Sequence, residues 1–487
     1  MQVFADIVQG LSRDNDPAAG PVLRQAAALA IDFLATVDGR RVGASAVPPL
    51  SNVLPDVGAS PEVVVADLAA AVDPGLVASN GPRYFGFVNG GTLPAALAAD
   101  WLASAWDQNA CLHVMSPAAA AVERVAAGWL VDLFGLPPAT SVGFTTGATM
   151  ANCTALAAAR QAVLADVGWD VAERGLASAP ALTIVVGDHV HASVLSALQL
   201  LGVGRTSLRR VAVDGEGRMR AGALADVLAE IDGPRIVCAQ AGNVGSGASD
   251  PFAAIADAMA VARARDGRRG WLHVDGAFGL WAAASPARRT LVAGVERADS
   301  WATDAHKWLN VPYDCGVVFV RDAAAHRAAM TVAASYLAAA GAAERDGADF
   351  VPELSRRARG VPVYAALRSL GRRGVAALVD RCSERARQMA ELLRSADGVT
   401  VLNDVVLNQV LVRFTPADGG DADACTRDVI RRVQDDGTCW LGGTTWHGAA
   451  AMRVSVSHWA TSEDDITRSA AAILRCARAA GLERRRT

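Results

Sequence analysis

Short apolar runs alternate with longer, Ala-rich segments of helical pattern between residues 141 and 320. The runs read SVGFT, LTIVVG, RIVCA, WLHV and GVVFV. Runs of this length with few polar residues are typical of strands that are buried on both faces. Strands that alternate with helices form a mainly parallel sheet covered on both sides. The pattern therefore predicts an α/β fold, in which ligands bind beyond the carboxyl ends of the strands.

Lys307 is the only lysine in the chain, and the other 45 of the 46 basic residues are arginine. Arginine cannot replace lysine where a neutral amine must attack a carbonyl carbon, because the guanidinium group stays protonated. A lone lysine kept in an apolar setting, between His306 and Trp308, is therefore a candidate Schiff-base nucleophile. The alternative is a surface lysine that has survived by chance.

Asp275 follows the apolar run Trp271–Val274 and precedes Lys307 in the chain. A carboxylate at the end of a buried strand can keep a pyridine nitrogen protonated, while a lysine further along carries the aldehyde carbon of pyridoxal phosphate. The two residues together therefore indicate this cofactor. Alone, Asp275 would more simply be a helix cap.

The segments HVDGAFG and DAHKWLNVPYDCG resemble the group II pyridoxal-phosphate decarboxylases, which include aromatic-amino-acid, glutamate and histidine decarboxylases. The resemblance extends from about Pro82 to the C-terminus. It implies a fold-type-I, aminotransferase-like large domain, a small α+β C-terminal domain, a helical N-terminal segment and a homodimer. It also implies that the enzyme converts an L-amino acid to an amine and carbon dioxide, with the cofactor held on Lys307.

A chain of this length predicts two or three domains. We expect a helical dimerisation segment (1–78), a large cofactor-binding domain (79–330), a lid (331–360) and a small C-terminal domain (361–487). The resemblance implies that the first segment, with helices near 23–39 and 61–73, packs across the dimer partner. Ordinary packing within one chain is the alternative.

A small-residue turn between a strand and a helix, Thr146, Gly147, Ala148 and Thr149, is the expected phosphate site. Backbone N–H groups at a helix start bind anions. Met150 departs from the family, which often has Glu there. The resemblance assigns His191 to the face of the pyridine ring and, with Asp275 and Lys307, to catalysis. It adds further cofactor residues: Gln240 or Asn243 near the ring hydroxyl, Ala277, and the phosphate contacts Asp304 and His306.

The resemblance also implies substrate-binding residues. Arg453 occupies the position whose guanidinium pairs with the substrate α-carboxylate. The other candidates lie in loops: Phe87, Val88, Asn89, His113 and His447. Each could instead be an ordinary loop residue, and Arg453 an ordinary surface arginine. An aromatic or aliphatic amino acid is the expected substrate.

Loops as long as residues 331–360 are usually lids in enzymes. In the aromatic-amino-acid branch of the family, the lid supplies a protonating tyrosine, but this chain has none at the expected place. Phe350 is the nearest aromatic residue, and Tyr336 lies too far upstream. Within the family, phenylalanine at that position accompanies oxidative aldehyde formation. Aldehyde synthesis and carbon–carbon lyase or aldolase chemistry therefore stay open as alternatives, and a pseudoenzyme is a further one.

The net charge and the cysteine spacing limit the partners, location and metal sites that we expect. The net charge is −4 with dispersed arginines, which argues against a nucleic-acid partner. We expect no membrane span, because Asp100 interrupts the apolar segment around it, and no signal peptide, because the N-terminus lacks a basic region. Eight cysteines without metal-ligand spacing indicate free thiols and no metal site. A cytoplasmic enzyme is expected.

Overall fold

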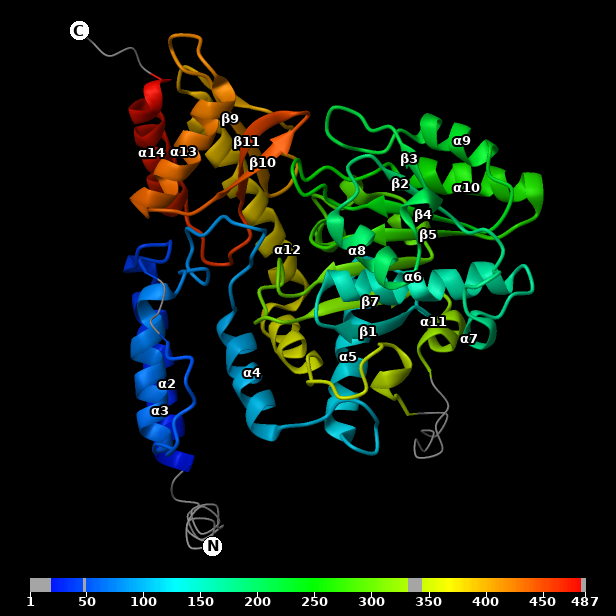
Figure 1. Ribbon diagram of the computed structural model, residues 1–487, viewed down its shortest axis with the longest axis horizontal. Helices are drawn as coiled ribbons and strands as arrows, with labels where there is room; N and C mark the ends of the chain where they lie inside the picture. The colour runs from blue at the N-terminus through cyan, green and yellow to red at the C-terminus, as the bar shows by residue number, and fades with distance from the viewer. Residues whose placement is uncertain (1–18, 47–49, 332–343, 483–487) are drawn as a thin grey trace, which may run out of the picture.

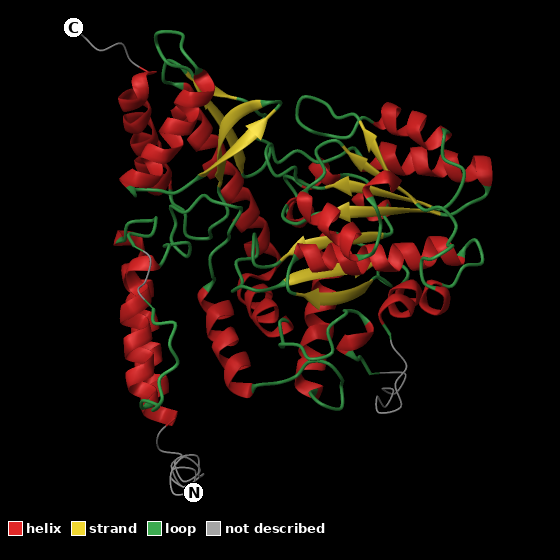
Figure 2. Cartoon of the chain, viewed as in Figure 1, coloured by secondary structure: helices red, strands yellow, loops and turns green. Residues whose placement is uncertain are grey.

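The computed structural model describes residues 19–46, 50–331 and 344–482, in which two β-sheets are surrounded by helices (Figure 2). The larger sheet has seven strands in the order β1-β7-β6-β5-β4-β2-β3. Its strands are β1 Ser141–Thr145, β2 Thr183–Gly187, β3 Leu208–Val211, β4 Arg235–Gln240, β5 Gly270–Asp275, β6 Ser300–Asp304 and β7 Gly316–Val320. Strands β3, β2, β4, β5 and β6 are parallel, whereas β7 runs antiparallel to both β6 and β1. The predicted α/β fold with a mainly parallel sheet is confirmed.

Helices cover both faces of this sheet (Figure 1). The helices of this region are α5 Pro117–Phe134, α6 Ala148–Ala165, α7 Val171–Arg174, α8 Ala192–Leu200, α9 Ala221–Ala229, α10 Phe252–Asp266, α11 Ala323–Met330 and α12 Gly360–Arg394. Alternate strand residues enter different cores: Ile184 and Val186 pack with α6 and α8, and Val185 packs in the core on the other face. This two-residue alternation follows from strand geometry and explains why the strands are apolar throughout.

The C-terminal part forms a second, antiparallel sheet in the order β10-β11-β9-β8. Its elements are β8 Val399–Val401, β9 Gln409–Phe414, α13 Ala422–Asp436, β10 Gly442–Trp446, β11 Ala449–Ser455 and α14 Glu463–Ala477. The long helix α12 leads from the large sheet to this part and bends at Gly371, whose φ is 60°. The small α+β C-terminal domain is therefore present as expected.

The N-terminal helices lie beside the rest of the chain (Figure 1). They are α2 Ala19–Thr36 and α3 Pro61–Val72, which pack along each other, with α4 Pro94–Trp106 following. Neither α2 nor α3 buries a single residue, and apolar side chains such as Leu23, Ile31, Val64 and Leu68 are exposed. The pair therefore carries an apolar surface that the chain itself leaves uncovered.

Among the described residues, one helix, Ala19–Gly39, is long and apolar enough by length and composition to cross a membrane. Arg24 and Asp32 interrupt this helix, and the absence of a membrane span stays a prediction. The core helix of a soluble protein and a signal sequence pass the same test. Gln25 of α2 donates a hydrogen bond to the carbonyl of Glu62 in α3 (3.2 Å).

Short helical turns complete the described structure. They are η2 Val37–Gly39, η3 Asp73–Gly75, η4 Arg205–Ser207, η5 Gly279–Ala284, η6 Arg289–Val292, η7 Val295–Arg297, η8 Gly347–Asp349 and η9 Arg478–Leu482. All eight cysteines are free, as predicted. The domain boundaries drawn from the sequence stay a prediction, and residues 332–343 of the expected lid lie outside the described residues.

A buried ion cluster ties α5 to the segment that precedes α12. Glu123 is almost fully buried, and its Oε1 lies 2.7 Å from Nη2 of Arg356. Arg356 also donates to the carbonyls of Ala110 and Phe144, and Arg345 lies 3.9 Å from the same carboxylate. The cluster therefore fixes the C-terminal part of the expected lid against β1 and α5.

Candidate active site

Lys307 lies three residues beyond the carboxyl end of β6, at the sheet edge where β4 and β5 also end. Its side chain is 18% exposed, and its Nζ lies 3.0 Å from Oδ2 of Asp304. The other carboxylate oxygen of Asp304 accepts the backbone N–H of Ala148 at 2.6 Å. Asp304 therefore links the lysine to the first residue of α6.

The turn before α6 is packed closely against its surroundings. Gly316, which begins β7, is so near the backbone of Gly147 that no side chain fits between them. A side chain at Gly147 would contact the ring of His306. Thr149 is exposed at the start of α6, and Thr146 is half-buried. The turn thus keeps a helix start open beside Lys307, as an anion site requires.

His306 is buried against this turn. Its Nδ1 accepts the backbone N–H of Cys315 at 3.1 Å, and its Nε2 lies 3.4 Å from Asp304. Burial lowers the pKa of His306; the negative charge of Asp304 opposes this effect, and the positive charge of Lys307 adds to it. The imidazole is therefore neutral near pH 7.

Asp275 ends β5 and is buried. Its Oδ1 accepts the N–H of Ala277 (3.2 Å), and its Oδ2 accepts the hydroxyl of Ser193 (3.3 Å). His191 is the N-cap of α8, where its Nδ1 accepts the N–H of Ser193 at 3.2 Å. Helix α8 begins at Ala192, four residues after Asp188, which follows β2.

Burial also lowers the pKa of His191, with Asp275 opposing this effect and Lys307 and Arg453 adding to it. These charges act on the ring because His191, Asp275, Lys307 and Arg453 lie close together. The structure thus brings together residues from β5, the loop after β6, the start of α8 and the C-terminal sheet.

A buried polar chain behind Asp275 was not found from the sequence. His273, in the middle of β5, has its Nε2 2.9 Å from Oδ1 of Asn152 and its Nδ1 2.9 Å from the hydroxyl of Ser300. Asn152 in turn donates to the hydroxyl of Ser193 (3.3 Å). Burial lowers the pKa of His273 to about 3, so it stays neutral and holds this chain in place. The available signal was a polar ring inside an apolar strand.

Arg453 lies on β11 and is largely buried. Its Nη1 donates to the carbonyl of Val244 at 3.4 Å, and no carboxylate pairs with it among the described residues. Burial lowers its pKa. A desolvated guanidinium without a counter-charge gains energy from an incoming carboxylate, which suits the role expected for Arg453.

The loop Phe87–Gly90 lies directly on the lysine. Gly90 packs so closely on the carbonyl oxygen of Lys307 that a side chain has no room there. Phe87 and Val88 both have positive φ, at 51° and 63°. Backbone strain of this kind costs on the order of 1–3 kcal/mol per residue and gathers at functional sites. Val88 is buried, and Phe87 is exposed with its ring stacked on Trp440 (5.5 Å).

Tyr313 is a second residue that the sequence reasoning missed. Its hydroxyl donates to Oδ1 of Asn89 at 2.7 Å, and its ring stacks on His306 with centroids 4.3 Å apart. The motif that carries Lys307 contains this tyrosine, so the signal was present in the sequence.

The side chains of the other sequence candidates contact residues outside the group around Lys307. The ring of His113 lies 3.4 Å from Glu344, His447 binds the carbonyl of Gly215 (3.0 Å), and the carboxamide oxygen of Asn243 accepts the N–H groups of Gly245 and Ser246. Their roles toward cofactor or substrate stay predictions. Phe350 packs on His326 and Arg345 beside β1 rather than beside Lys307. Tyr336 lies outside the described residues.

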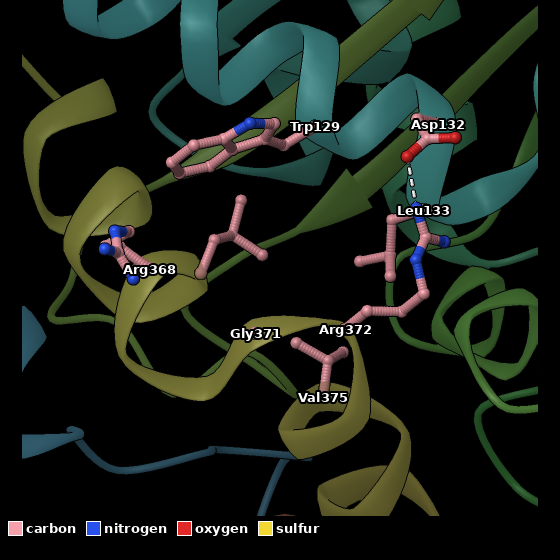
Figure 3. Close-up of a pocket in the computed structure, with 8 residues that line it drawn as sticks. Trp129, Asp132, Leu133, Arg368, Gly371, Arg372 and Val375 are labelled. Carbon is pink, nitrogen blue, oxygen red and sulfur yellow. Dashed lines mark hydrogen bonds and ion pairs between the residues drawn. The ribbon is translucent and has the colours of Figure 1, made fainter.

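A separate cavity of about 230 Å³ opens between α5 and α12, where α12 bends at Gly371 (Figure 3). Trp129, Leu133 and Val375 line it, and an ion pair between Asp132 and Arg372 borders it. Neither helix carries any of the expected site residues, so this cavity is distinct from the site around Lys307.

The residues around Lys307 fit pyridoxal phosphate. The first turn of α6 offers the backbone N–H groups that follow that of Ala148, which Asp304 accepts. Asp275 offers a buried carboxylate at the same sheet edge, and Lys307 offers the amine. The sequence profile described as the pyridoxal-dependent decarboxylase conserved domain matches residues 47–415. The chain belongs to this family. Its cofactor is pyridoxal phosphate, and the fold and the family expected from the sequence are both confirmed.

Relatives in the family act on different amino acids. Tryptophan decarboxylase 1 of Oryza sativa subsp. japonica is 29% identical over 450 residues, 84% of this chain and 85% of that protein. L-2,4-diaminobutyrate decarboxylase of Rhizobium meliloti (strain 1021) is 29% identical over 490 residues, 97% and 94% of the two chains. Phenylacetaldehyde synthase of Arabidopsis thaliana is 24% identical over 479 residues, 92% and 94%.

Solved structures share the fold. The crystal structure of Oryza sativa TDC with PLP and tryptamine superposes with a TM-score of 0.87 at 24% identity, covering 96% of this chain and 99% of that one. The crystal structure of mouse CSAD gives 0.86 at 24% identity, covering 94% and 98%.

Proposed function

We propose that this protein decarboxylates an L-amino acid to an amine and carbon dioxide. The observation that carries the proposal is the position of Lys307, the sole lysine, beside Asp304 and at the same sheet edge as Asp275. When bound, pyridoxal phosphate supplies an electron sink for the bond that breaks at the α-carbon.

The chain's own residues bind and orient the reactants. Asp275, held by Ala277 and Ser193, keeps a proton on the pyridine nitrogen. Neutral His191 would contact the bound cofactor and could donate a hydrogen bond from Nε2, because its Nδ1 accepts from the backbone N–H of Ser193. Arg453, which has no carboxylate partner among the described residues, binds a carboxylate of the substrate.

Oxidative aldehyde formation is the second candidate, because the relatives include a phenylacetaldehyde synthase. Phe350, the aromatic residue that raised this alternative, packs its ring on His326 and Arg345. Simple decarboxylation stays the first candidate, because the tryptophan and diaminobutyrate relatives are decarboxylases.

An aromatic amino acid is the proposed substrate class. Phe87 is exposed in the loop Phe87–Gly90, whose Gly90 packs on Lys307. Tyr84 and Phe87 both stack on Trp440 (5.1 and 5.5 Å). Exposed and stacked rings of this kind bind a further ring well. The tryptophan decarboxylase among the relatives agrees with this choice, and the diaminobutyrate decarboxylase provides the contrasting substrate.

We further propose a cytoplasmic homodimer in which α2 and α3 pack on the second copy. Both helices bury no residue within the chain, and their apolar side chains are exposed. Apolar patches of this kind mark protein interfaces. Light scattering after size-exclusion chromatography tests this: removal of residues 1–78 should yield a monomer, and a monomeric full-length protein would contradict it.

The function is tested by incubating the protein and pyridoxal phosphate with a panel of amino acids and measuring carbon dioxide, amine, aldehyde and peroxide together. Equal amounts of carbon dioxide and amine support the proposal. Carbon dioxide with aldehyde and peroxide indicates the second candidate, and cleavage of another bond indicates a lyase or aldolase. A protein that binds the cofactor but turns over nothing would be a pseudoenzyme.

Because Lys307 is the only lysine, borohydride reduction gives an independent readout of cofactor attachment. It should fix one cofactor per chain on the peptide that contains Lys307. Lys307→Arg should abolish both this mass shift and carbon dioxide release while the protein stays folded. A shift that persists on that peptide in the variant would overturn the assignment.

A further inference from the structure

Asn310 closes the turn that carries Lys307. Its side chain is fully buried, and its φ of 55° lies in the left-handed region, which asparagine adopts more readily than most residues. The backbone N–H of Asn310 donates to the carbonyl of Lys307 at 3.2 Å, and its own carbonyl accepts the N–H of Leu93 at 2.7 Å. The backbone of Asn310 therefore fixes the lysine turn against the loop that precedes α4.

The side-chain amide of Asn310 is bonded on both of its sides. Its Nδ2 donates to the carbonyls of Trp308 (2.9 Å) and Ser457 (3.0 Å) and lies 3.3 Å from the carbonyl of Lys307. Its Oδ1 accepts the backbone N–H of Trp459 at 2.9 Å. Carbonyl oxygens can only accept and a backbone N–H can only donate, so only a carboxamide in this orientation satisfies all of these groups.

The amide of Asn310 joins the lysine turn to the C-terminal sheet. Ser457 and Trp459 follow β11, the strand that carries Arg453, and a single residue separates Ser457 from the end of that strand. Because Asn310 and Ser457 are both buried, the hydrogen bond between them is shielded from water and is costly to break. A short path thus leads from Arg453 along β11 to Ser457, and through the amide of Asn310 to Lys307.

The separation between Lys307 and Arg453 matters for the proposed reaction. The amino group that reacts with the cofactor and the carboxylate that Arg453 binds belong to one small molecule, so the two residues must be held at one distance. Lys307 follows the large sheet and Arg453 lies on the C-terminal sheet, so no shared strand or helix fixes this distance. Contacts between the two parts, such as those of Asn310, have to do so.

We propose that Asn310 is a positioning residue that sets the place of Lys307 relative to Arg453. This rests on the proposed function, in which Arg453 binds the carboxylate of the substrate. Loss of the amide leaves each of the two residues able to bind its own group, but it weakens their joint action on one molecule.

Two replacements of Asn310 tolerate its positive φ. Asn310→Asp keeps the size of the side chain but places a carboxylate oxygen against the carbonyls of Trp308 and Ser457, which repel it. Asn310→Gly removes the side chain and is the milder change, so it serves for the quantitative measurements. Asn310→Asp should shift the same measurements further in the same direction.

Asn403 provides the matched control, because it makes the same kind of contacts away from the lysine turn. It is buried between β8 and β9, and its Oδ1 accepts the N–H of Leu411 at 2.8 Å. Its Nδ2 donates to the carbonyls of Ser246, Asp404 and Gln409. Asn403→Gly should therefore lower stability much as Asn310→Gly does, without changing the surroundings of Lys307.

The first measurement is hydrogen exchange of the cofactor-free protein, read by mass spectrometry, which needs no activity. In Asn310→Gly the N–H of Trp459 loses its acceptor, so exchange in residues 456–460 should be faster by roughly tenfold, the size of one net hydrogen bond. Exchange in residues 307–311 should rise as well, because the lysine turn loses its bonds to the amide. Unchanged exchange in both segments overturns the inference, as does an equal rise in Asn403→Gly.

The second measurement asks whether Lys307 and Arg453 act together through Asn310. α-Methyltryptophan, or 2,4-diaminobutyrate if that compound does not bind, is titrated into four cofactor-loaded proteins: the wild type, Asn310→Gly, Arg453→Met and the double variant. The visible absorbance of the cofactor is the signal. Arg453→Met should raise Kd more than about tenfold in the wild type but less than about threefold in the Asn310→Gly background. Equal effects in the two backgrounds mean that Asn310 is only structural.

The outcomes separate this inference from the proposed reaction. A non-additive result in a protein that releases no carbon dioxide supports the role of Asn310, while the reaction is then a different one. Carbon dioxide release together with an additive result leaves the reaction and overturns the role of Asn310. An Arg453→Met protein that binds the compound as the wild type does overturns it too.

Discussion

Replacing Gly90 with alanine should separate the loop Phe87–Gly90 from the lysine segment. A Cβ built on Gly90 would lie 1.7 Å from the carbonyl oxygen of Lys307, whereas real Cβ atoms keep at least 3.0 Å from such neighbours. The two backbones must therefore move apart by at least 3.0 − 1.7 = 1.3 Å. Because both groups belong to the main chain, the clash cannot be relieved by rotating a side chain.

Lys307 would move with its own carbonyl group, and misplacement of about 1 Å near reacting groups costs about a hundredfold in rate. We expect Gly90→Ala to reduce kcat/KM for carbon dioxide release by at least that factor and to weaken cofactor retention. Overpacking should also lower the free energy of unfolding by about 1–3 kcal/mol.

Gly128→Ala is the matched control, because Gly128 lies on the exposed face of α5 with nothing within 4 Å of an added Cβ. There the same substitution should leave activity unchanged and stabilise the helix by about 1 kcal/mol. The assays are steady-state carbon dioxide release, equilibrium dialysis of the cofactor and urea unfolding. A folded Gly90→Ala protein with wild-type kcat/KM and cofactor affinity would refute the close packing described here.

Three further outcomes are expected. Glu123→Gln leaves Arg356 buried without its counter-charge and should cost about 3–5 kcal/mol in urea unfolding; a loss below about 1 kcal/mol would contradict this. Arg453→Met should raise KM for the amino acid more than about tenfold with the fold intact, and Arg453→Lys should restore part of it; an unchanged KM would remove Arg453 from the substrate site. Burial lowers the pKa of His326 to about 3, so its contribution to stability is complete above pH 6.5 and is lost as the pH falls from 6.5 toward 3, by up to about 1.4 kcal/mol per pH unit. His326→Gln should flatten the dependence of the unfolding free energy on pH in that range, and an unchanged slope would argue against a buried neutral ring.

The sequence predicted the parts of the fold that depend on burial. The strands near 142 and 272 were found because both of their faces are covered, which leaves almost no polar positions in them. Asp275 and Lys307 were placed at one edge because parallel strands present their carboxyl ends together. Asp275 indeed ends β5, and Lys307 follows the neighbouring strand β6.

The direction of β7 was not predicted, because an apolar run looks the same in both directions. The connection from Asp304 to Gly316 nevertheless held a signal: the 316 − 304 − 1 = 11 residues between them are fewer than the dozen or more that a parallel crossover needs. An antiparallel strand was the better expectation.

Contacts between distant loops were the least predictable. His447 and Asn243 were candidates for the site because of their neighbours in the sequence, yet their side chains bind loop backbones at Gly215 and Gly245. Tyr313 was passed over although its hydroxyl meets Asn89, 224 residues away. Periodicity and local motifs carry no information about partners at such separations.

The antiparallel strand β7 also sets the order in which this protein can be completed on the ribosome. Strand β1, which leads into the turn at Thr146–Thr149, pairs with β7 and with no other strand of its sheet. Ser141 and Val320, which face each other there, are 179 residues apart. Translation adds about 5–20 residues per second, so β7 is synthesised about 10–35 s after β1. The turn and Lys307 therefore come into register late in translation, and a nascent chain that ends before Gly316 holds the lysine without the strand that joins it to the turn.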